Sequence, residues 1–167
     1  QVFETLDQLR MSPKARDYAK AIFTILGNAE SKAHQVHFDS VHLHEVGELD
    51  SILDVAGVAI AYESLGSPRL KCSVLPSGKG TVQTSHGPLE CPVPAVVAVA
   101  DEFQIPLEEV HVWGETVTPT GIAILAGLGC EFLSKDAIFD GRVLGRGAGT
   151  KRFAHRPNLI RLRECNS

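Results

Sequence analysis

The stretch that decides the fold is Ser12–His34, which reads SPKARDYAKAIFTILGNAESKAH. Its opening serine and proline indicate a helix start, because a serine side chain caps free backbone amides and proline is tolerated at the first helical position. Apolar side chains then recur three and four residues apart, which is the spacing of one face of a helix. The stretch therefore predicts a helix from Pro13 to about His34.

A second apolar stretch lies downstream at residues 49–65, and Gly66 and Pro68 are expected to end it as a helix. Apolar residues occur almost all round this stretch, which predicts a helix that is buried on most of its faces. Residues 36–46, between the two helices, are expected to form a loop or a short strand.

The rest of the chain mixes short strands with short helices. Extended segments are expected at residues 69–75, 81–91, 110–113, 115–117, 138–146 and 158–163, and helices at residues 94–103 and 118–133. Turns are expected at residues 78–80 and at the glycine-rich residues 145–149. A β-hairpin of residues 69–75 and 81–91 is plausible around the turn at residues 78–80, with the second strand interrupted at residues 86–88. Because no βαβ rhythm repeats, residues 1–167 predict an α+β fold, a single compact domain of mixed helices and short β-strands or hairpins.

Composition excludes several classes of protein. The 167 residues are enough for one ordinary domain that needs no disulfide or metal as a staple. With 16 Lys and Arg against 20 Asp and Glu, the formal charge of -4 gives no global attraction to nucleic acid or to an anionic membrane. No apolar run approaches the roughly 20 residues of a membrane span, and residues 1–10 are too polar for a signal sequence. We therefore expect a cytoplasmic protein that binds neither nucleic acid nor membrane.

The cysteines indicate reduced thiols rather than a disulfide framework or a zinc knuckle. They lie far apart in sequence and form no C-x-x-C pair, at Cys72, Cys91, Cys130 and Cys165. Cys91 with His86 could act as a nucleophile and its base. No third group is in place to orient that pair, so a structural Cys91 is the favoured interpretation.

Residues 42–45, with the sequence HLHE, carry the strongest indication of chemistry. In an extended segment, residues two apart point to the same face, so His42 and His44 can present both imidazoles to one ion, with Glu45 beside them. Imidazole and carboxylate ligands suit nickel, zinc, copper or iron. An H-x-H also opens metal-dependent hydrolases built on large barrels, but those need about 250 residues.

Two aspartates follow this segment on one helix face, at Asp50 and Asp54. Asp54 falls within an apolar run, where an unpaired carboxylate would cost several kcal/mol, so it needs a partner such as His42 or His44. The competing interpretation is that the histidines are ordinary residues, that Asp50 caps the helix and that Asp54 meets backbone donors.

Two further segments could bind a phosphate. Thr118-Pro119-Thr120 opens a helix, where free amides and a partial positive charge suit an anion, although it can also be a plain cap. Residues 145–152, with the sequence GRGAGTKR, form a basic glycine-rich segment that could wrap an anion or be a hairpin turn with solvated charges. Neither this segment nor residues 78–81 fits a dinucleotide or P-loop pattern.

Several motifs follow one another in order across residues 29–162. They are His42–Gly47 with Asp50 and Asp54, Gly80-Thr81 with His86-Gly87, Pro92–Ala95, Gly114-Glu115 with Thr118–Gly121, and Gly147–Thr150. Together they closely resemble the LarC family, the nickel-insertion proteins of nickel-pincer cofactor synthesis. Motifs in one order are far more specific than any one of them.

The resemblance implies a nickel-insertion enzyme, a lyase or chelatase that uses nickel as a substrate metal. Its small-molecule partner would be a pyridinium bis-thiocarboxylic acid mononucleotide. Carbon–nickel and sulfur–nickel bonds would form in this molecule, with CTP hydrolysis. The product would serve as the cofactor of lactate racemase and related enzymes. The family's opening segment would precede Gln1, and a portion that binds CTP with a divalent metal would follow Ser167. We therefore expect a central fragment, inactive alone, and a homo-oligomer.

Carried over by motif, the resemblance and the residue chemistry give a set of expected site residues. The metal ligands would be His42, His44 and His86. The catalytic carboxylates would be Glu45, Asp50 and Asp54. The cofactor's phosphate or carboxylate would meet Thr118, Thr120, Arg146, Gly147, Gly149, Lys151 and Arg152, in a segment that Lys151-Arg152-Phe153 makes unusually basic for the family. The alternative is a non-catalytic nickel-binding or oligomerisation module.

Overall fold

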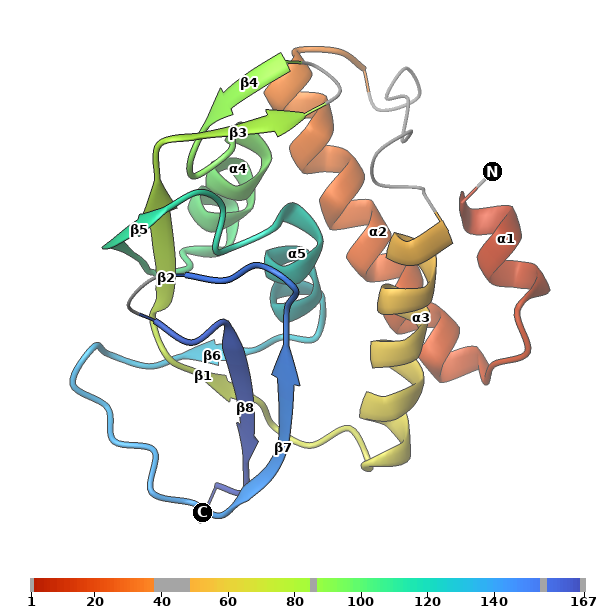
Figure 1. Ribbon diagram of the computed structural model, residues 1–167. Helices are drawn as coiled ribbons and strands as arrows, with labels where there is room; N and C mark the ends of the chain where they lie inside the picture. The colour runs from red at the N-terminus through yellow and green to blue at the C-terminus, as the bar shows by residue number, and fades with distance from the viewer. Residues whose placement is uncertain (1, 38–48, 85–86, 154–155, 166–167) are drawn as a thin grey trace.

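The computed structural model describes residues 2–37, 49–84, 87–153 and 156–165. Short strands gather on one side of the molecule, and the first three helices lie on the other (Figure 1). The helices are α1 (Val2–Gln8), α2 (Pro13–His34), α3 (Leu49–Ser64), α4 (Pro94–Phe103) and α5 (Pro119–Gly127). The strands are β1 (Lys71–Cys72), β2 (Leu75–Lys79), β3 (Thr81–Thr84), β4 (Gly87–Glu90), β5 (Leu107–Trp113), β6 (Glu131–Phe132), β7 (Val143–Ala148) and β8 (Leu159–Arg163). The predicted α+β class is confirmed.

Helix α2 is the centre of the fold, and its bounds are those that the sequence predicts. The hydroxyl oxygen of Ser12 accepts a hydrogen bond from the backbone N–H of Ala15 (3.0 Å), which satisfies one of the free amides of the first turn. At the other end, Gln35 adopts a left-handed conformation and its N–H bonds to carbonyl oxygens of the last turn. Helix α2 contacts α3, α4 and α5, so it lies between two clusters of buried side chains.

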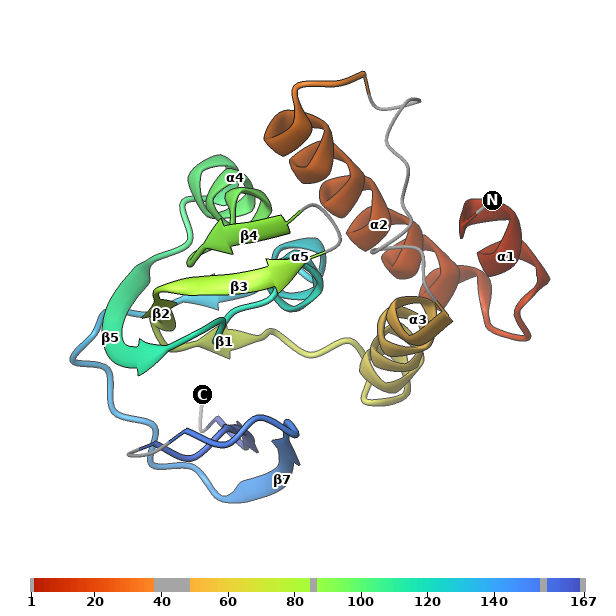
Figure 2. The same ribbon diagram turned by 45° about the horizontal axis from the view of Figure 1, so that its top comes forward.

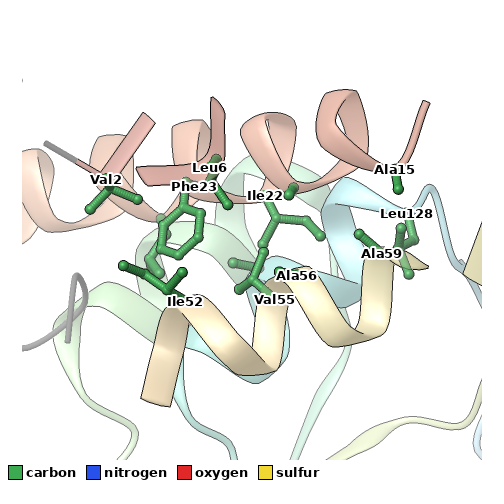
Figure 3. Close-up of a cluster of buried hydrophobic side chains, with 13 residues drawn as sticks. Val2, Leu6, Ala15, Ile22, Phe23, Ile52, Val55, Ala56, Ala59 and Leu128 are labelled. Atoms are coloured by element: carbon green, nitrogen blue, oxygen red, sulfur yellow. The ribbon is translucent and has the colours of Figure 1, made fainter. Parts of the chain in front are cut away.

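The first cluster lies between α1, α2 and α3 (Figure 3). Ile22 and Phe23 of α2 are fully buried there, with Leu6 of α1 and Val55 of α3. Each apolar side chain of this size stabilises the fold by roughly 1.5–3 kcal/mol when it is fully buried. The second cluster lies between α2, α4 and α5 and includes the buried residues Ala29, Val96, Val99 and Ile122.

Helix α3 is confirmed at Leu49–Ser64, but the prediction that it is buried on most faces is wrong. Ile52 and Val55 are buried, whereas Leu53 and Ile60 are 58% and 44% exposed. The reason is that α1, α2 and α5 contact only one side of α3. Its outer side faces away from the other described helices (Figure 2).

The described strands pair two by two. β1 pairs with β6 and β2 with β5 in parallel, while β3–β4 and β7–β8 are antiparallel. The hairpin expected between residues 69–75 and 81–91 is wrong, because β1 pairs with β6 and β2 with β5, while residues 81–84 pair with residues 87–90 as β3 and β4. None of the described helices combines the length and the apolarity needed to cross a membrane.

The turn predicted at residues 78–80 is wrong in part, because β2 continues through Gly78 to Lys79. A Cβ atom on Gly78 would lie 2.0 Å from the carbonyl oxygen of Gly114, next to β5. Glycine is therefore needed here for the close approach of two backbones rather than for a turn. The chain turns one residue later, at Gly80, where φ is +85°.

Several other predicted bounds also change. The helix expected at residues 118–133 ends at Gly127, because the chain reverses at Gly129 (φ +67°) and enters β6. The strand expected at residues 69–75 shortens to β1, the strand expected at residues 138–146 begins at Val143, and residues 115–117 form no strand. The helix at residues 94–103 is confirmed as α4.

The glycine-rich residues 145–149 are the largest correction, because most of them lie within strand β7 and not in a turn. A Cβ atom on Gly147 would lie 3.0 Å from Cγ2 of Ile160, so the glycine makes room for a side chain of β8. The β7–β8 hairpin adds no side chain to the two buried clusters and lies to one side of the helices (Figure 2).

Candidate functional site

The predicted metal ligands His42, His44 and His86 and the carboxylate Glu45 lie outside the described residues. Their roles stay predictions. Within residues 2–37, 49–84, 87–153 and 156–165, no three His, Cys, Asp or Glu side chains are grouped so that they could hold a metal ion.

Asp50 and Asp54 lie on the solvent side of α3. Asp50 lies within the first turn of α3, where its Oδ1 accepts a hydrogen bond from the backbone N–H of Ser51 (2.9 Å). Asp54 is exposed, so the prediction that it is a buried carboxylate in need of a partner is wrong. Only one side of α3 is buried, and Asp54 lies with Leu53 on the side that is exposed to solvent. Both carboxylates remain accessible to a ligand that approaches the start of α3.

Thr118 caps helix α5. Its hydroxyl oxygen accepts a hydrogen bond from the backbone N–H of Gly121 (3.1 Å), and Pro119 occupies the first helical position. Thr120 follows in the first turn and is half-buried. The geometry favours the interpretation of this segment as a cap, with the Thr118 hydroxyl already engaged.

Strand β7 places Arg146 directly opposite Arg161 of β8. Directly opposed residues of an antiparallel pair share a face, and like charges in such positions repel each other. Both arginines are exposed, so an anion bound between them would relieve this repulsion. Sequence reasoning found Arg146 but missed Arg161, because the partner of a strand residue depends on the register, which residues 159–163 do not reveal alone.

Of the basic residues after β7, Lys151 interacts electrostatically with Glu115 and Cys91. Lys151 lowers the pKa of Glu115, although burial outweighs this effect and leaves the pKa of Glu115 above its ordinary value. Lys151 also acts on Cys91, whose pKa is raised by burial and by Glu115. The Nδ2 amide of Asn158 donates to the carbonyl oxygen of Lys151 (3.2 Å), while Arg152 is exposed.

Cys91 therefore has the properties of a structural cysteine. Burial raises the pKa of its thiol, which disfavours the nucleophilic thiolate. Its backbone N–H donates to the carbonyl oxygen of Gly80 (2.8 Å) at the base of the β3–β4 hairpin. These observations support the interpretation that the sequence favours for this residue.

A second group of functional side chains, missed by sequence reasoning, lies at the end of the β2–β5 pair. Nζ of Lys79 lies 3.2 Å from Nδ1 of His111 and 5.8 Å from the ring centroid of Trp113. Trp113 is 76% exposed. A Cβ atom on Gly80 would lie 2.5 Å from Cε3 of Trp113, so the indole ring packs against the backbone of Gly80, where a side chain would not fit. The sequence signal that could have found the group is the chain's only tryptophan, next to the Gly114-Glu115 motif.

We call Lys79, His111 and Trp113 the tryptophan cluster. Glu115 follows it by two residues, and Lys151 acts electrostatically on Glu115. The tryptophan cluster itself combines an exposed aromatic face, an imidazole and an ammonium group, which suits a flat ligand that carries negative charge.

A groove of about 790 Å³ between α2 and α4 has a different character. It is lined by Lys32, Ala33, Glu90, Pro92, Pro94, Val97, Ala98, Asp101 and Glu102. Lys32 forms an ion pair with Glu102. The excess of carboxylates disfavours an anionic ligand, and none of the predicted site residues that the structure describes lines the groove.

Comparisons with known proteins agree on one family. Residues 1–165 match the family described as "Nickel insertion protein". A Staphylococcus epidermidis protein named "Pyridinium-3,5-bisthiocarboxylic acid mononucleotide nickel insertion protein" is 37% identical over 99% of this chain and 41% of its own length. Relatives from Myxococcus xanthus and Geotalea daltonii, whose names also refer to nickel insertion, are 40% and 41% identical over 90% and 94% of this chain. The chain spans about two fifths of the length of these relatives. No solved structure matches it.

Proposed function

Because the chain belongs to the family of nickel insertion proteins, we propose that it is part of an enzyme that inserts nickel into pyridinium-3,5-bisthiocarboxylic acid mononucleotide. The product would be the nickel-pincer cofactor that the resemblance to the LarC family implies. Nickel is a substrate of this reaction rather than a resident cofactor. CTP hydrolysis, with a divalent metal, is part of the proposed reaction and would fall to residues other than those of this chain.

The observation that carries the proposal is the exposed Trp113 ring with Lys79 beside it. A pyridinium ring is flat and cationic, so it gains from stacking on the electron-rich face of a tryptophan. Thiocarboxylates and phosphate are anionic, so they gain from the ammonium group of Lys79 and from Lys151 or the paired Arg146 and Arg161. The tryptophan cluster and these basic residues would thus offer a partner for each chemical group of the mononucleotide.

The metal-handling roles fall to the segment before α3. His42 and His44 are proposed to hold nickel during transfer, with His86 as a further ligand. Formation of a carbon–nickel bond at a C–H position releases a proton, and Glu45 is the proposed acceptor. The exposed carboxylates of Asp50 and Asp54, at the start of α3, are proposed to attract the cation and to share that proton.

An alternative is a non-catalytic nickel-binding or oligomerisation module. The observation that favours it is the apolar outer side of α3, where Leu49, Leu53 and Ile60 are exposed. Such a surface suits contact with a further protein surface, including a second copy of the chain. The test is conversion of the mononucleotide to its nickel adduct by the longer protein that contains this chain, followed by mass spectrometry with nickel and CTP present. Loss of the adduct in His44→Ala, with the fold retained, supports the enzyme, whereas unchanged conversion supports a module without catalytic activity.

Binding of the mononucleotide is tested with nicotinic acid mononucleotide, a pyridinium mononucleotide that carries a carboxylate. Trp113 is the only tryptophan, so saturable quenching of its fluorescence reports binding at this ring. Calorimetry of Trp113→Ala should show an affinity about fivefold lower, which corresponds to about 1 kcal/mol of ring stacking. Phe103→Ala, at an exposed aromatic residue on α4, is the control and should bind normally. Equal affinity in all three proteins would contradict the proposed role of Trp113.

A further inference from the structure

The pairing of β1 with β6 brings two cysteines near each other, Cys72 of β1 and Cys130, which immediately precedes β6. Cys72 is the register partner of Phe132, and the backbone N–H of Glu131 donates to the carbonyl oxygen of Leu70 (2.9 Å). Cys130 lies two residues before Phe132, so the pairing places it near Cys72.

The two thiols lie close enough for each to shift the pKa of the other. Interaction with the Cys130 thiol lowers the pKa of Cys72, although burial opposes the change. The same interaction, together with burial, raises the pKa of Cys130, whose thiol also donates to the carbonyl oxygen of Glu131 (3.9 Å). Ser73 supplies further hydrogen bonds to Cys72. The pair thus divides into a more acidic thiol at Cys72 and a thiol that keeps its proton at Cys130.

A pocket of about 210 Å³ lies next to the pair. Leu70, Gly129 and Glu131, which lie next to or near the cysteines in sequence, line it together with Arg69. The hydroxyl of Ser67 also lines this pocket, and among the described residues it is the buried side-chain group that lacks a hydrogen-bond partner. A small peptide-like molecule would find there the Ser67 hydroxyl and the Arg69–Glu131 ion pair (3.6 Å) as polar partners.

We propose that Cys72 and Cys130 form a reactive thiol pair that closes to an intramolecular disulfide by exchange with a small disulfide such as oxidised glutathione. The Cys72 thiolate attacks one sulfur of the small disulfide, forms a mixed disulfide and releases the first small thiolate. That thiolate accepts the proton of Cys130, and the Cys130 sulfur then attacks Cys72 and releases the second small thiolate, which takes a proton from water. The two cysteines give up two electrons and two protons, and the small disulfide is reduced to two thiols.

The pair occupies a position that links the two buried clusters. Leu70, beside β1, packs against the first cluster, and Phe132 of β6 packs against the second. A bond between Cys72 and Cys130 would join these two strands covalently and so hold the clusters together. This role is independent of nickel insertion, since it needs neither nickel nor the mononucleotide.

The test is incubation of the purified chain with oxidised glutathione, followed by protease digestion without reduction and mass spectrometry. The wild type should yield the Cys72–Cys130 linked peptide. Cys130→Ser should instead accumulate glutathione on Cys72, because the second thiol is missing. In Cys72→Ser, glutathione should appear on Cys130 about tenfold more slowly than on Cys72 in Cys130→Ser, because the remaining thiol is more basic.

Cys91→Ser and Cys165→Ser are the matched controls and should form the linked peptide as the wild type does. Circular dichroism of every variant checks that the fold is retained, since serine closely matches cysteine in size. A linked peptide that is absent in the wild type, or reaction of Cys72 at the same rate as Cys91, would overturn the proposal. Loss of the linked peptide in Cys91→Ser or Cys165→Ser would do the same, because it would place the reactive pair elsewhere.

Discussion

Arg146 of β7 and Arg161 of β8 are direct register partners, so two guanidinium groups project from one face of the β7–β8 hairpin. The formal charge of the whole chain is -4, so this local positive charge is not a consequence of the overall composition. Two opposed cations are unfavourable in a sheet unless an anion lies between them. An anion bound between Arg146 and Arg161 would therefore be expected to stabilise the hairpin.

Replacement of Arg161 should weaken anion binding without harm to the fold. Arg161→Gln should lower the affinity for nicotinic acid mononucleotide by about 1–3 kcal/mol, the value of a charge-assisted hydrogen bond, and by less at high salt. Its thermal stability should stay unchanged or rise slightly, because a like-charge pair is removed. Calorimetry at two salt concentrations measures the effect, and Lys14→Gln on α2 is the control. Equal losses in the two variants would indicate non-specific attraction only.

Two glycine substitutions should change stability in opposite directions. Gly78→Ala should destabilise the protein by about 1–3 kcal/mol or more, because its Cβ would lie 2.0 Å from the carbonyl oxygen of Gly114. Gly57→Ala, in the middle of α3 with no atom within 4 Å of the new Cβ, should stabilise it by about 0.5–1 kcal/mol. Urea denaturation of the two variants measures both. A stable Gly78→Ala protein would show that β2 and β5 are not as close as described.

The half-buried Glu115 should make stability depend on pH. Burial raises the pKa of this carboxyl group, so its contribution to stability is present below the ordinary pKa and is lost as the pH rises through the raised value. Glu115→Gln should therefore melt at a higher temperature than the wild type at pH 7, with the difference disappearing near pH 4. Glu109→Gln, at an exposed site on β5, should change the melting temperature little at either pH. An equal gain at pH 4 and pH 7 would contradict the assignment to ionisation.

The metal prediction rests on the H-x-H spacing and is tested by nickel titration. A protein in which both His42 and His44 are replaced by alanine should bind nickel at least about tenfold more weakly than the wild type by calorimetry. His111→Ala is the matched control, because it removes an imidazole from the tryptophan cluster and should leave nickel affinity unchanged. The prediction fails if the double variant retains the wild-type affinity.

The parts of the fold that depend on local chemistry could be predicted from the sequence. Helix α2 was predicted from Ser12, Pro13 and the apolar spacing, because caps and periodicity act within a few residues. Burial of α3 could not be predicted in the same way. Its composition is apolar all round, and only the positions of α1, α2 and α5 decide that Leu53 faces solvent.

The candidate site shows the same division. Arg146 and Lys151 were predicted because basic residues among glycines are visible in the sequence. Arg161, Lys79 and Trp113 depend on which strands pair, and that information comes from contacts between distant segments. The glycines of residues 145–149 suggest a turn in the sequence. In the structure most of them lie in β7, because glycine can either allow a turn or leave space for a side chain of a neighbouring strand, and sequence alone does not separate these two roles.

The parallel pairing of β1 with β6 also constrains the order in which the protein can fold during synthesis. The first cluster draws mainly on α1, α2 and α3, which leave the ribosome early, so most of it can pack while later residues are still being translated. β1 must wait as an unpaired segment until Glu131 and Phe132 have emerged. Such non-local pairing slows folding. We therefore expect nascent chains that stop before Glu131 to expose β1, and to depend on chaperones more than the completed chain does.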